Sequence, residues 1–197
     1  MGKLSFAAVI PAAGNSGRMG SQKVLLPYGN GSGFAEHLTS CFSVFGCDPV
    51  VLMVNEHFDS AILHVENLII IVNRQVEKGR SHSIHLGLQH VPEGAACFIH
   101  NIDNPFPKPA VLGELLKAVP SDGYAVPVYL GRGGHPVLLG CGMADLLRSQ
   151  RELADFRQAM NGFTKVEVPC TDEHILWNIN TPDEYLRFIR YTQPKTG

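Results

Sequence analysis

The chain has 197 residues, of which 45% are hydrophobic and 17% are charged, and its formal net charge is -2. Such a chain fits one ordinary domain with a full hydrophobic core, and it has no basic stripe or tail that would indicate a nucleic acid partner. No apolar run reaches the length of a membrane span, so we expect no membrane association. The five cysteines include no C-x-x-C pair, which favours reduced thiols in a cytoplasmic protein.

Short apolar runs alternate along the chain with segments whose apolar residues recur at helical spacing. In chain order, the predicted elements are strand 6–10, helix 34–45, strand 50–54, a turn of helix at 62–65, strand 68–72, helix 81–90, strand 95–99, helix 109–119, strands 124–129 and 137–139, helix 143–153, strand 166–168 and helix 181–191. Continuous apolar strands that alternate with helices are typical of a mostly parallel sheet covered on both faces. We therefore predict a single α/β domain, residues 1–197, with a three-layer α/β/α architecture around a twisted sheet.

A glycine-rich stretch follows the first predicted strand and carries two cations, Arg18 and Lys23. Gly14, Gly17 and Gly20 have no side chains, so a ligand could approach the backbone, whose exposed N–H groups attract anions. Arginine can also hold a phosphate group through two hydrogen bonds. The stretch therefore suits a phosphate-binding loop, but its spacing matches neither the P-loop nor the dinucleotide fingerprint. Spacing alone does not separate a phosphate loop from a turn that binds nothing.

The predicted strand 95–99 is followed by the sequence H-N-I-D-N-P, in which Asp103 is the only carboxylate. In open α/β sheets, ligands bind beyond the carboxyl ends of the strands. A carboxylate there can hold Mg²⁺ together with substrate phosphates. An ordinary turn is the alternative, because Asp and Asn before proline favour turns in any protein.

Two later segments carry residue types that suit a binding cleft. Gly79, Ser81 and Ser83 stand near the start of a predicted helix, where backbone and hydroxyl groups can donate hydrogen bonds to a nucleotide. Helix capping explains the same residues without a ligand. The glycine-rich turn 131–136 could deliver Arg132 and His135 to a cleft, although a lone histidine in a turn is more often incidental.

The segment 177–185 leads into the last predicted helix. Thr181 fits the N-cap of this helix, and Pro182 fits its first position. Asp183 and Glu184 then place negative charge in the first turn, where it interacts favourably with the helix dipole. This capping is a complete structural explanation of the segment by itself.

These segments occur in the order found in the MobA-like nucleotidyltransferases, and the chain resembles that family from residue 6 to residue 185. The glycine-rich stretch carries the opening motif, A-A-G-x-S-x-R-M-G-x-x-K-x-L-L, over residues 12–26. The other matches are G-x-x-x-S-I-x-x-G-L at 79–88, the D-x-P that begins at residue 103, G-x-x-G-H-P-V-L at 131–138 and N-I-N-T-P at 178–182. The G-H-P-V-L segment is similar to the molybdopterin-type transferases and is lacking in the isoprenoid-precursor transferases.

The resemblance implies a Rossmann-like nucleotidyltransferase fold of the nucleotide-diphospho-sugar transferase type and a Mg²⁺-dependent reaction. In this reaction a nucleoside monophosphate moves from a nucleoside triphosphate to a phosphorylated acceptor, and pyrophosphate is released. The implied catalytic residues are Arg18, Lys23 and Asp103, the implied Mg²⁺ ligands are Asp103 and Asn180, and the implied acceptor contacts are Arg132 and His135. The residues implied to bind the nucleotide are Ala12, Ala13, Gly14, Ser16, Gly17, Arg18, Lys23, Gly79, Ser81 and Ser83.

The form Ala12-Ala13-Gly14 resembles the cytidylyl branch of the family, whereas the guanylyl branch usually carries Ala-Gly-Gly. We therefore expect CTP rather than GTP as the nucleotide and molybdopterin as the acceptor, with a molybdoenzyme or a chaperone open as a protein partner. The chain departs from the family where Asn178 replaces the commoner Asp and where residues 151–157 lack a G-D-x-G-x-R stretch. Two alternatives follow: transfer to a sugar phosphate or another small phosphate, and a non-catalytic nucleotide- or cofactor-binding protein.

Overall fold

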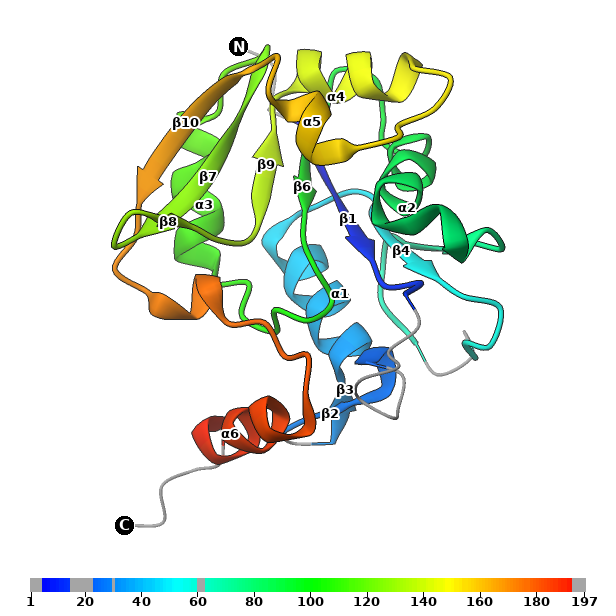
Figure 1. Cartoon of the computed structure of the whole chain (residues 1–197), viewed down its shortest axis with the longest axis vertical. Coiled ribbons are helices and arrows are strands. Elements are labelled where there is room, and N and C mark those ends of the chain that lie inside the picture. The colour runs from blue at the N-terminus through cyan, green and yellow to red at the C-terminus, as the bar shows by residue number, and fades with distance from the viewer. Residues whose placement is uncertain (1–4, 15–22, 30, 60–62, 193–197) are drawn as a thin grey trace.

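The predicted apolar strands come together in one twisted sheet (Figure 1). The computed structural model describes residues 5–14, 23–29, 31–59 and 63–192. The strands of the sheet are β1 (Phe6–Pro11), β4 (Val50–Val54), β5 (Leu68–Val72), β6 (Ala96–Ile99), β7 (Gly123–Tyr129), β8 (Arg132–Gly133), β9 (Val137–Leu139) and β10 (Thr164–Pro169). Their order is β10-β7-β9-β6-β1-β4-β5, with β8 paired to β7.

The sheet is mostly parallel, as predicted. β1 pairs in parallel with both β4 and β6, and β7 pairs in parallel with β10. Only β9, which is antiparallel to β6 and β7, and the short β8 break this pattern among the described strands. A separate antiparallel pair, β2 (Pro27–Tyr28) and β3 (Ser32–Gly33), follows the glycine-rich stretch. Since parallel strands share a direction, β1 and β6 end at the same edge of the sheet.

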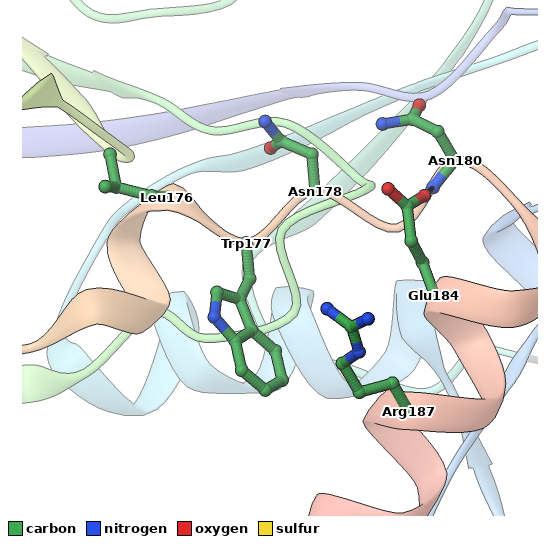
Figure 2. Close-up of a pocket in the computed structure, with 6 residues that line it drawn as sticks. All are labelled: Leu176, Trp177, Asn178, Asn180, Glu184 and Arg187. Atoms are coloured by element: carbon green, nitrogen blue, oxygen red, sulfur yellow. Dashed lines mark hydrogen bonds between the residues drawn. The ribbon is translucent and has the colours of Figure 1, made fainter.

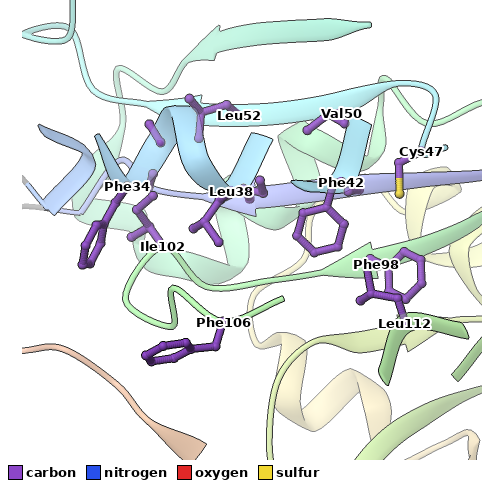
Figure 3. Packing of buried hydrophobic residues seen from close by; sticks show 14 of the residues in the cluster. Phe34, Leu38, Phe42, Cys47, Val50, Leu52, Phe98, Ile102, Phe106 and Leu112 are labelled. Carbon is purple, nitrogen blue, oxygen red and sulfur yellow. The ribbon is translucent and has the colours of Figure 1, made fainter. Parts of the chain in front are cut away.

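Helices cover both faces of the sheet, which confirms the three-layer prediction. The helices are α1 (Phe34–Phe45), α2 (Gly79–Leu88), α3 (Pro109–Ala118), α4 (Cys141–Ser149), α5 (Phe156–Met160) and α6 (Pro182–Thr192). One buried cluster joins α1 and α3 to the sheet, and Figure 3 shows Phe34, Leu38, Phe42 and Leu112 within it. The cluster on the other face contains Ile84 and Leu88 of α2 and Met143 and Leu147 of α4. Within the described residues, no helix combines the length and apolar composition needed to cross a membrane.

Two predicted helices differ from the structure. The predicted turn of helix at 62–65 is wrong in its described part, because residues 63–65 have no regular secondary structure and Leu63 packs against the core from an irregular segment. The predicted helix 143–153 ends instead at Ser149. Leu153 is buried, but it reaches the core from the loop before α5 rather than from a continuing helix. In both segments the apolar residue does pack against the core, but the backbone that carries it is irregular rather than helical.

The last helix begins as predicted. Thr181 Oγ1 accepts a hydrogen bond from the backbone N–H of Glu184, and the Glu184 carboxylate accepts one from the backbone N–H of Thr181 at 2.9 Å. This reciprocal arrangement is a capping box, and Pro182 opens the helix behind it. The capping fixes where α6 starts and therefore where Asn180 lies. Figure 1 shows α6 in the lower part of the molecule, beyond the end of β1.

Candidate functional site

Three segments that are distant in sequence meet at the side chain of Lys23. Lys23 opens a single 3-10 turn after the glycine-rich stretch, and its Nζ donates a hydrogen bond to Asn180 Oδ1 at 2.6 Å. The same Nζ lies 3.6 Å from Asp103 Oδ2, and the Lys23 and Asp103 side chains are only 15% and 20% exposed. The structure therefore brings together one predicted cation and both predicted metal ligands.

Backbone contacts hold the two ligand-bearing segments side by side. The backbone N–H of Ile179 donates to the backbone oxygen of Asp103 at 2.7 Å. Ile179 is buried, so its side chain anchors the segment in the core between the exposed Asn178 and the partly buried Asn180. Asp103 and Asn180 are thus positioned by the fold rather than by each other.

Asn104 is a structural residue of the site that the sequence analysis did not single out. Its side chain is fully buried, and Nδ2 lies 2.9 Å from the backbone oxygens of His174 and Trp177. Its Oδ1 accepts a hydrogen bond from the backbone N–H of Phe106. The amide therefore ties the strand end to the segment that leads to Asn180. The available sequence signal was an asparagine before proline, which indicates only a turn.

The carboxylate of Asp103 lies among positive charges. Burial raises the pKa of Asp103, and the charges of Lys23 and Arg80 partly offset this effect. Arg80 stands in the first turn of α2, and its guanidinium carbon lies 5.9 Å from the centroid of the Phe156 ring. Arg80 was not among the predicted site residues, although it lies inside the matched segment 79–88. Its charge adds to the positive potential that an anionic ligand would meet here.

The carboxyl end of β1 leads into this site. Ala12 and Ala13 are buried, and the backbone N–H of Ala12 donates to the backbone oxygen of Met53 at 2.8 Å. A Cβ atom on Gly14 would meet no atom of the described residues within 4 Å, so these residues leave open space beside the backbone at that point. Residues 15–22 lie outside the described residues, and with them the predicted site residues Ser16, Gly17 and Arg18.

The first turn of α2 provides the second predicted nucleotide segment. Gly79 adopts a φ of +79°, which favours glycine, and its surroundings are open. Ser81 Oγ accepts from the backbone N–H of Phe156, and Ser83 Oγ accepts from Asn73 Nδ2, both at 2.9 Å. Each hydroxyl still has its own O–H to donate. These serines therefore anchor α2, and both retain a donor.

The predicted acceptor contacts, Arg132 and His135, lie in different surroundings. Arg132 is exposed in β8, at the side of β7. His135 is largely enclosed: its Nε2 lies 2.8 Å from Asn101 Nδ2, and its backbone N–H donates to the oxygen of Ile175. Burial lowers the pKa of His135 to about 4, and the charge of Arg80 contributes to this shift. His135 is therefore a neutral group near the end of β6, whereas Arg132 is a charged group on the surface.

A cavity of about 360 Å³ adjoins Asn180. Its lining residues are Leu176, Trp177, Asn178, Asn180, Glu184 and Arg187 (Figure 2). Figure 2 shows the Trp177 ring and the Arg187 guanidinium on one side of the segment, with the amides of Asn178 and Asn180 directed to the other. The cavity is polar at its Asn180 end, so a hydrogen-bonding ligand could extend from the site into it.

The residues present fit a hard divalent cation. Asp103 Oδ1 is buried and has no hydrogen-bond partner among the described residues, and Asn180 Oδ1 faces a cation, the Lys23 ammonium. Oxygen donors of this kind suit Mg²⁺, which is usually held by one or two carboxylates plus substrate phosphates and waters. In the described part of the chain, no group of three or more His, Cys, Asp and Glu side chains could hold a metal ion. A metal here would therefore depend on the substrate for several of its ligands.

His100 lies fully buried beside the site. From its burial we expect the stability of the protein to depend on pH. Burial lowers the pKa of His100 from 6.5 to about 3, and the nearby His135 contributes. The unfolded chain therefore binds a proton below about pH 6.5 that the folded chain does not, so stability falls as pH falls. The expected loss is up to about 1.4 kcal/mol for each pH unit between those two pKa values.

The measurement is urea unfolding of the protein and of His100→Gln at about pH 7, 6 and 5. Glutamine can still donate to the oxygen of Asn104, which accepts from His100 Nε2 at 2.7 Å. The variant should show a shallower loss of unfolding free energy with acid. His57→Ala is the control, because the His57 side chain is 74% exposed. If the unfolding free energies of the protein and of His100→Gln changed equally with pH, His100 would not be the source of the pH dependence.

The fold and the site together define an α/β protein in which a carboxylate, an amide and basic side chains meet beyond the carboxyl ends of the strands. A family model described as the MobA-like NTP transferase domain matches residues 8–166. The chain belongs to this family and is a nucleotidyltransferase. Members of the family use a nucleoside triphosphate and a phosphorylated acceptor.

Several known proteins are similar to this chain over nearly their whole length. The molybdenum cofactor cytidylyltransferase of Escherichia coli K12 is 25% identical over 191 residues, which are 94% of this chain and 96% of that protein. The structure of Rv0371c from Mycobacterium tuberculosis H37Rv has a TM-score of 0.80 and 22% identity, with 96% and 100% of the two chains covered. A second Rv0371C structure, a complex with manganese, has a TM-score of 0.73 and 18% identity, and covers 95% and 98%.

A cytidylyltransferase named for an acceptor other than the molybdenum cofactor has a similar fold. The structure of 2-C-methyl-D-erythritol 4-phosphate cytidylyltransferase from Thermus thermophilus has a TM-score of 0.71 and 17% identity, with 96% of this chain and 99% of that chain covered. These likenesses confirm the predicted nucleotide-diphospho-sugar transferase type of fold. At this identity they show the fold and not the substrate.

Proposed function

We propose that the protein transfers CMP from CTP to a phosphorylated acceptor in a Mg²⁺-dependent reaction that releases pyrophosphate, with molybdopterin as the acceptor. The observation that carries the proposal is the convergence of Lys23, Asp103 and Asn180 at one point. The name of the Escherichia coli relative supports the choice of nucleotide and acceptor. We also propose a cytoplasmic location, in line with five free cysteines and a sequence without a C-x-x-C motif, and a molybdoenzyme or chaperone as protein partner.

The nucleotide lies, in this proposal, between the end of β1 and the start of α2. Backbone N–H groups near Gly14 and the cations Lys23, Arg18 and Arg80 face the triphosphate. An oxygen of the acceptor phosphate attacks the α-phosphorus of CTP, a new P–O bond forms, and the bond to the pyrophosphate oxygen breaks. Mg²⁺ held by Asp103 and Asn180 would neutralise phosphate charge. The protein contributes alignment and fixed positive charge rather than a covalent intermediate.

The experiment that tests the proposal is a pyrophosphate-release assay with CTP, GTP, ATP and UTP, with and without Mg²⁺. Each nucleotide is paired with molybdopterin, with a sugar phosphate and with no acceptor. Release that requires CTP and molybdopterin supports the proposal. The Thermus thermophilus neighbour favours a sugar-phosphate-like acceptor as the second candidate, and release with that acceptor alone would replace molybdopterin. Nucleotide binding without release from any pair would support the non-catalytic alternative.

His135→Ala should leave CTP affinity nearly unchanged and raise the apparent KM for the acceptor. In the proposed site Mg²⁺, backbone amides and cations bind the nucleotide, and none of them needs the neutral imidazole of His135. Calorimetry gives the CTP affinity, and initial rates give the KM. A rise of roughly tenfold would correspond to the loss of one hydrogen bond, about 1.4 kcal/mol. His57→Ala, at an exposed position, should change neither quantity. Loss of CTP binding in a folded His135→Ala variant would contradict the proposal that His135 contacts the acceptor and not the nucleotide.

A further inference from the structure

The Lys23 ammonium occupies the position that a metal ion would need. It lies 2.6 Å from Asn180 Oδ1 and 3.6 Å from Asp103 Oδ2, the oxygens of the two proposed metal ligands. A divalent ion in contact with both oxygens would lie against the ammonium group. Two positive charges at such a separation repel strongly when water is largely excluded, and the Lys23 and Asp103 side chains are at least four-fifths enclosed. One cation can therefore bind between these oxygens, but not both.

The fold holds the backbone of Asp103 and of Asn180 side by side whether or not the lysine leaves. The backbone hydrogen bond from Ile179 to Asp103 joins the two segments, and Asn104 anchors the backbone at Trp177, shortly before Asn180. The backbone of Lys23 is also fixed, because its oxygen accepts from the backbone N–H of Leu26 and the next side chain, Val24, is buried. Lysine has a flexible four-carbon stem, so the ammonium group can move while the backbone stays in place, and it needs another anion to leave Asp103.

We propose that Lys23 closes the metal position in the nucleotide-free protein and that a triphosphate opens it by drawing the ammonium group onto its phosphates. This inference rests on the proposed function and concerns the order in which that site assembles. The metal then binds well only together with the nucleotide, and by thermodynamic linkage the nucleotide binds better with the metal. The arrangement keeps the carboxylate of Asp103 neutralised at every stage, first by lysine and then by the metal.

The test compares the binding of Mn²⁺, as a probe for the metal, to the protein and to Lys23→Met, without nucleotide, by titration calorimetry and by electron paramagnetic resonance of the free ion. Methionine is close to lysine in length but carries no charge, so it vacates the position without opening a large hole. We expect Lys23→Met to bind Mn²⁺ roughly tenfold more tightly than the unaltered protein, a typical coupling between sites. The same substitution should weaken the binding of tripolyphosphate in the presence of EDTA.

Arg80→Met is the matched control, since it removes another positive charge that acts on Asp103 but does not lie between the two oxygens. Its gain in Mn²⁺ affinity should be smaller than that of Lys23→Met. Asp103→Asn added to Lys23→Met should abolish the gain. Equal or weaker Mn²⁺ binding by Lys23→Met, in a protein whose circular dichroism is unchanged, overturns the inference, as does an Arg80→Met gain of equal size.

The metal titration requires neither turnover nor acceptor, so its result is separate from that of the proposed function. Suppose that Lys23→Met binds Mn²⁺ more tightly and that the unaltered protein transfers CMP to no acceptor. The inference would then stand and the proposed function would be wrong. CMP transfer with unchanged Mn²⁺ binding would do the reverse.

Discussion

Asp103→Ala will abolish nucleotidyl transfer while leaving the fold intact. The variant removes the carboxylate that pairs with Lys23 and lies beside Asn180, so the proposed Mg²⁺ loses its charged ligand. Loss of such charge stabilisation lowers turnover at least roughly a hundredfold. The measurement is the rate of pyrophosphate release at saturating CTP and Mg²⁺, with the melting temperature measured in parallel.

The fold should tolerate this change because burial of the Asp103 carboxylate opposes its ionisation, as its raised pKa indicates. The backbone oxygen of residue 103, which accepts from Ile179, is unaffected by the substitution. Glu114→Ala is the matched control, since it removes a carboxylate that forms a surface pair with Lys117. Retention of near-normal Mg²⁺-dependent rates in Asp103→Ala would contradict the assignment of Asp103 as a metal ligand.

Asn104→Ala will destabilise the protein by about 3 kcal/mol or more. The side chain is fully buried, and its loss leaves the backbone oxygen of Trp177 without its donor and the backbone N–H of Phe106 without its acceptor. The backbone oxygen of His174 also loses a hydrogen bond, although it still accepts one from the backbone N–H of Trp177. Buried polar groups that lose their partners pay the full desolvation penalty. Urea unfolding measures the loss of stability, and calorimetry should also show weaker CTP binding, since Asn104 anchors the segment that carries Asn180.

Asn161→Ala is the control for this prediction. Asn161 is an exposed asparagine at the end of α5, and its substitution should change the unfolding free energy by less than about 0.5 kcal/mol. A similar small change in Asn104→Ala would mean that the buried amide does not hold the segment in solution. Loss of stability with unchanged CTP affinity would instead separate the structural role of Asn104 from the position of Asn180.

Local signals in the sequence predicted most of the elements. The run at residues 50–54 is entirely apolar and forms the fully buried strand β4. Phe34, Leu38 and Phe42 recur at helical spacing and lie on the buried side of α1. The predicted N-cap at Thr181 is present because capping depends on groups only three residues apart. The prediction that a helix continues to residue 153 is wrong because it also used local signals alone. An apolar residue just beyond the end of a helix can have the same spacing as one inside it.

The neighbours of the site residues could not be read from spacing. The sequence indicated a strand-end carboxylate at Asp103 and a cation after a glycine-rich stretch at Lys23. The family resemblance added Asn180. The contact between Lys23 and Asn180 was not evident, because it joins residues 157 positions apart. Arg80 likewise has a role only because α2 packs against β1 and brings the charge of Arg80 close enough to act on Asp103, and Asn104 has one only because a later segment passes over it.

By itself, the sequence determined an α/β chain with a mostly parallel sheet, buried apolar strands, a well-capped last helix and the motifs of a nucleotidyltransferase. These properties follow from hydrophobic periodicity, capping and residue type, which act over a few positions along the chain. Only the tertiary structure decided that β9 runs antiparallel, that His135 is enclosed while Arg132 is exposed, and that Lys23 lies between Asp103 and Asn180. The physical reason is that burial, desolvation and ion pairing depend on which strands and segments become neighbours, and strand order is fixed by packing of the whole core.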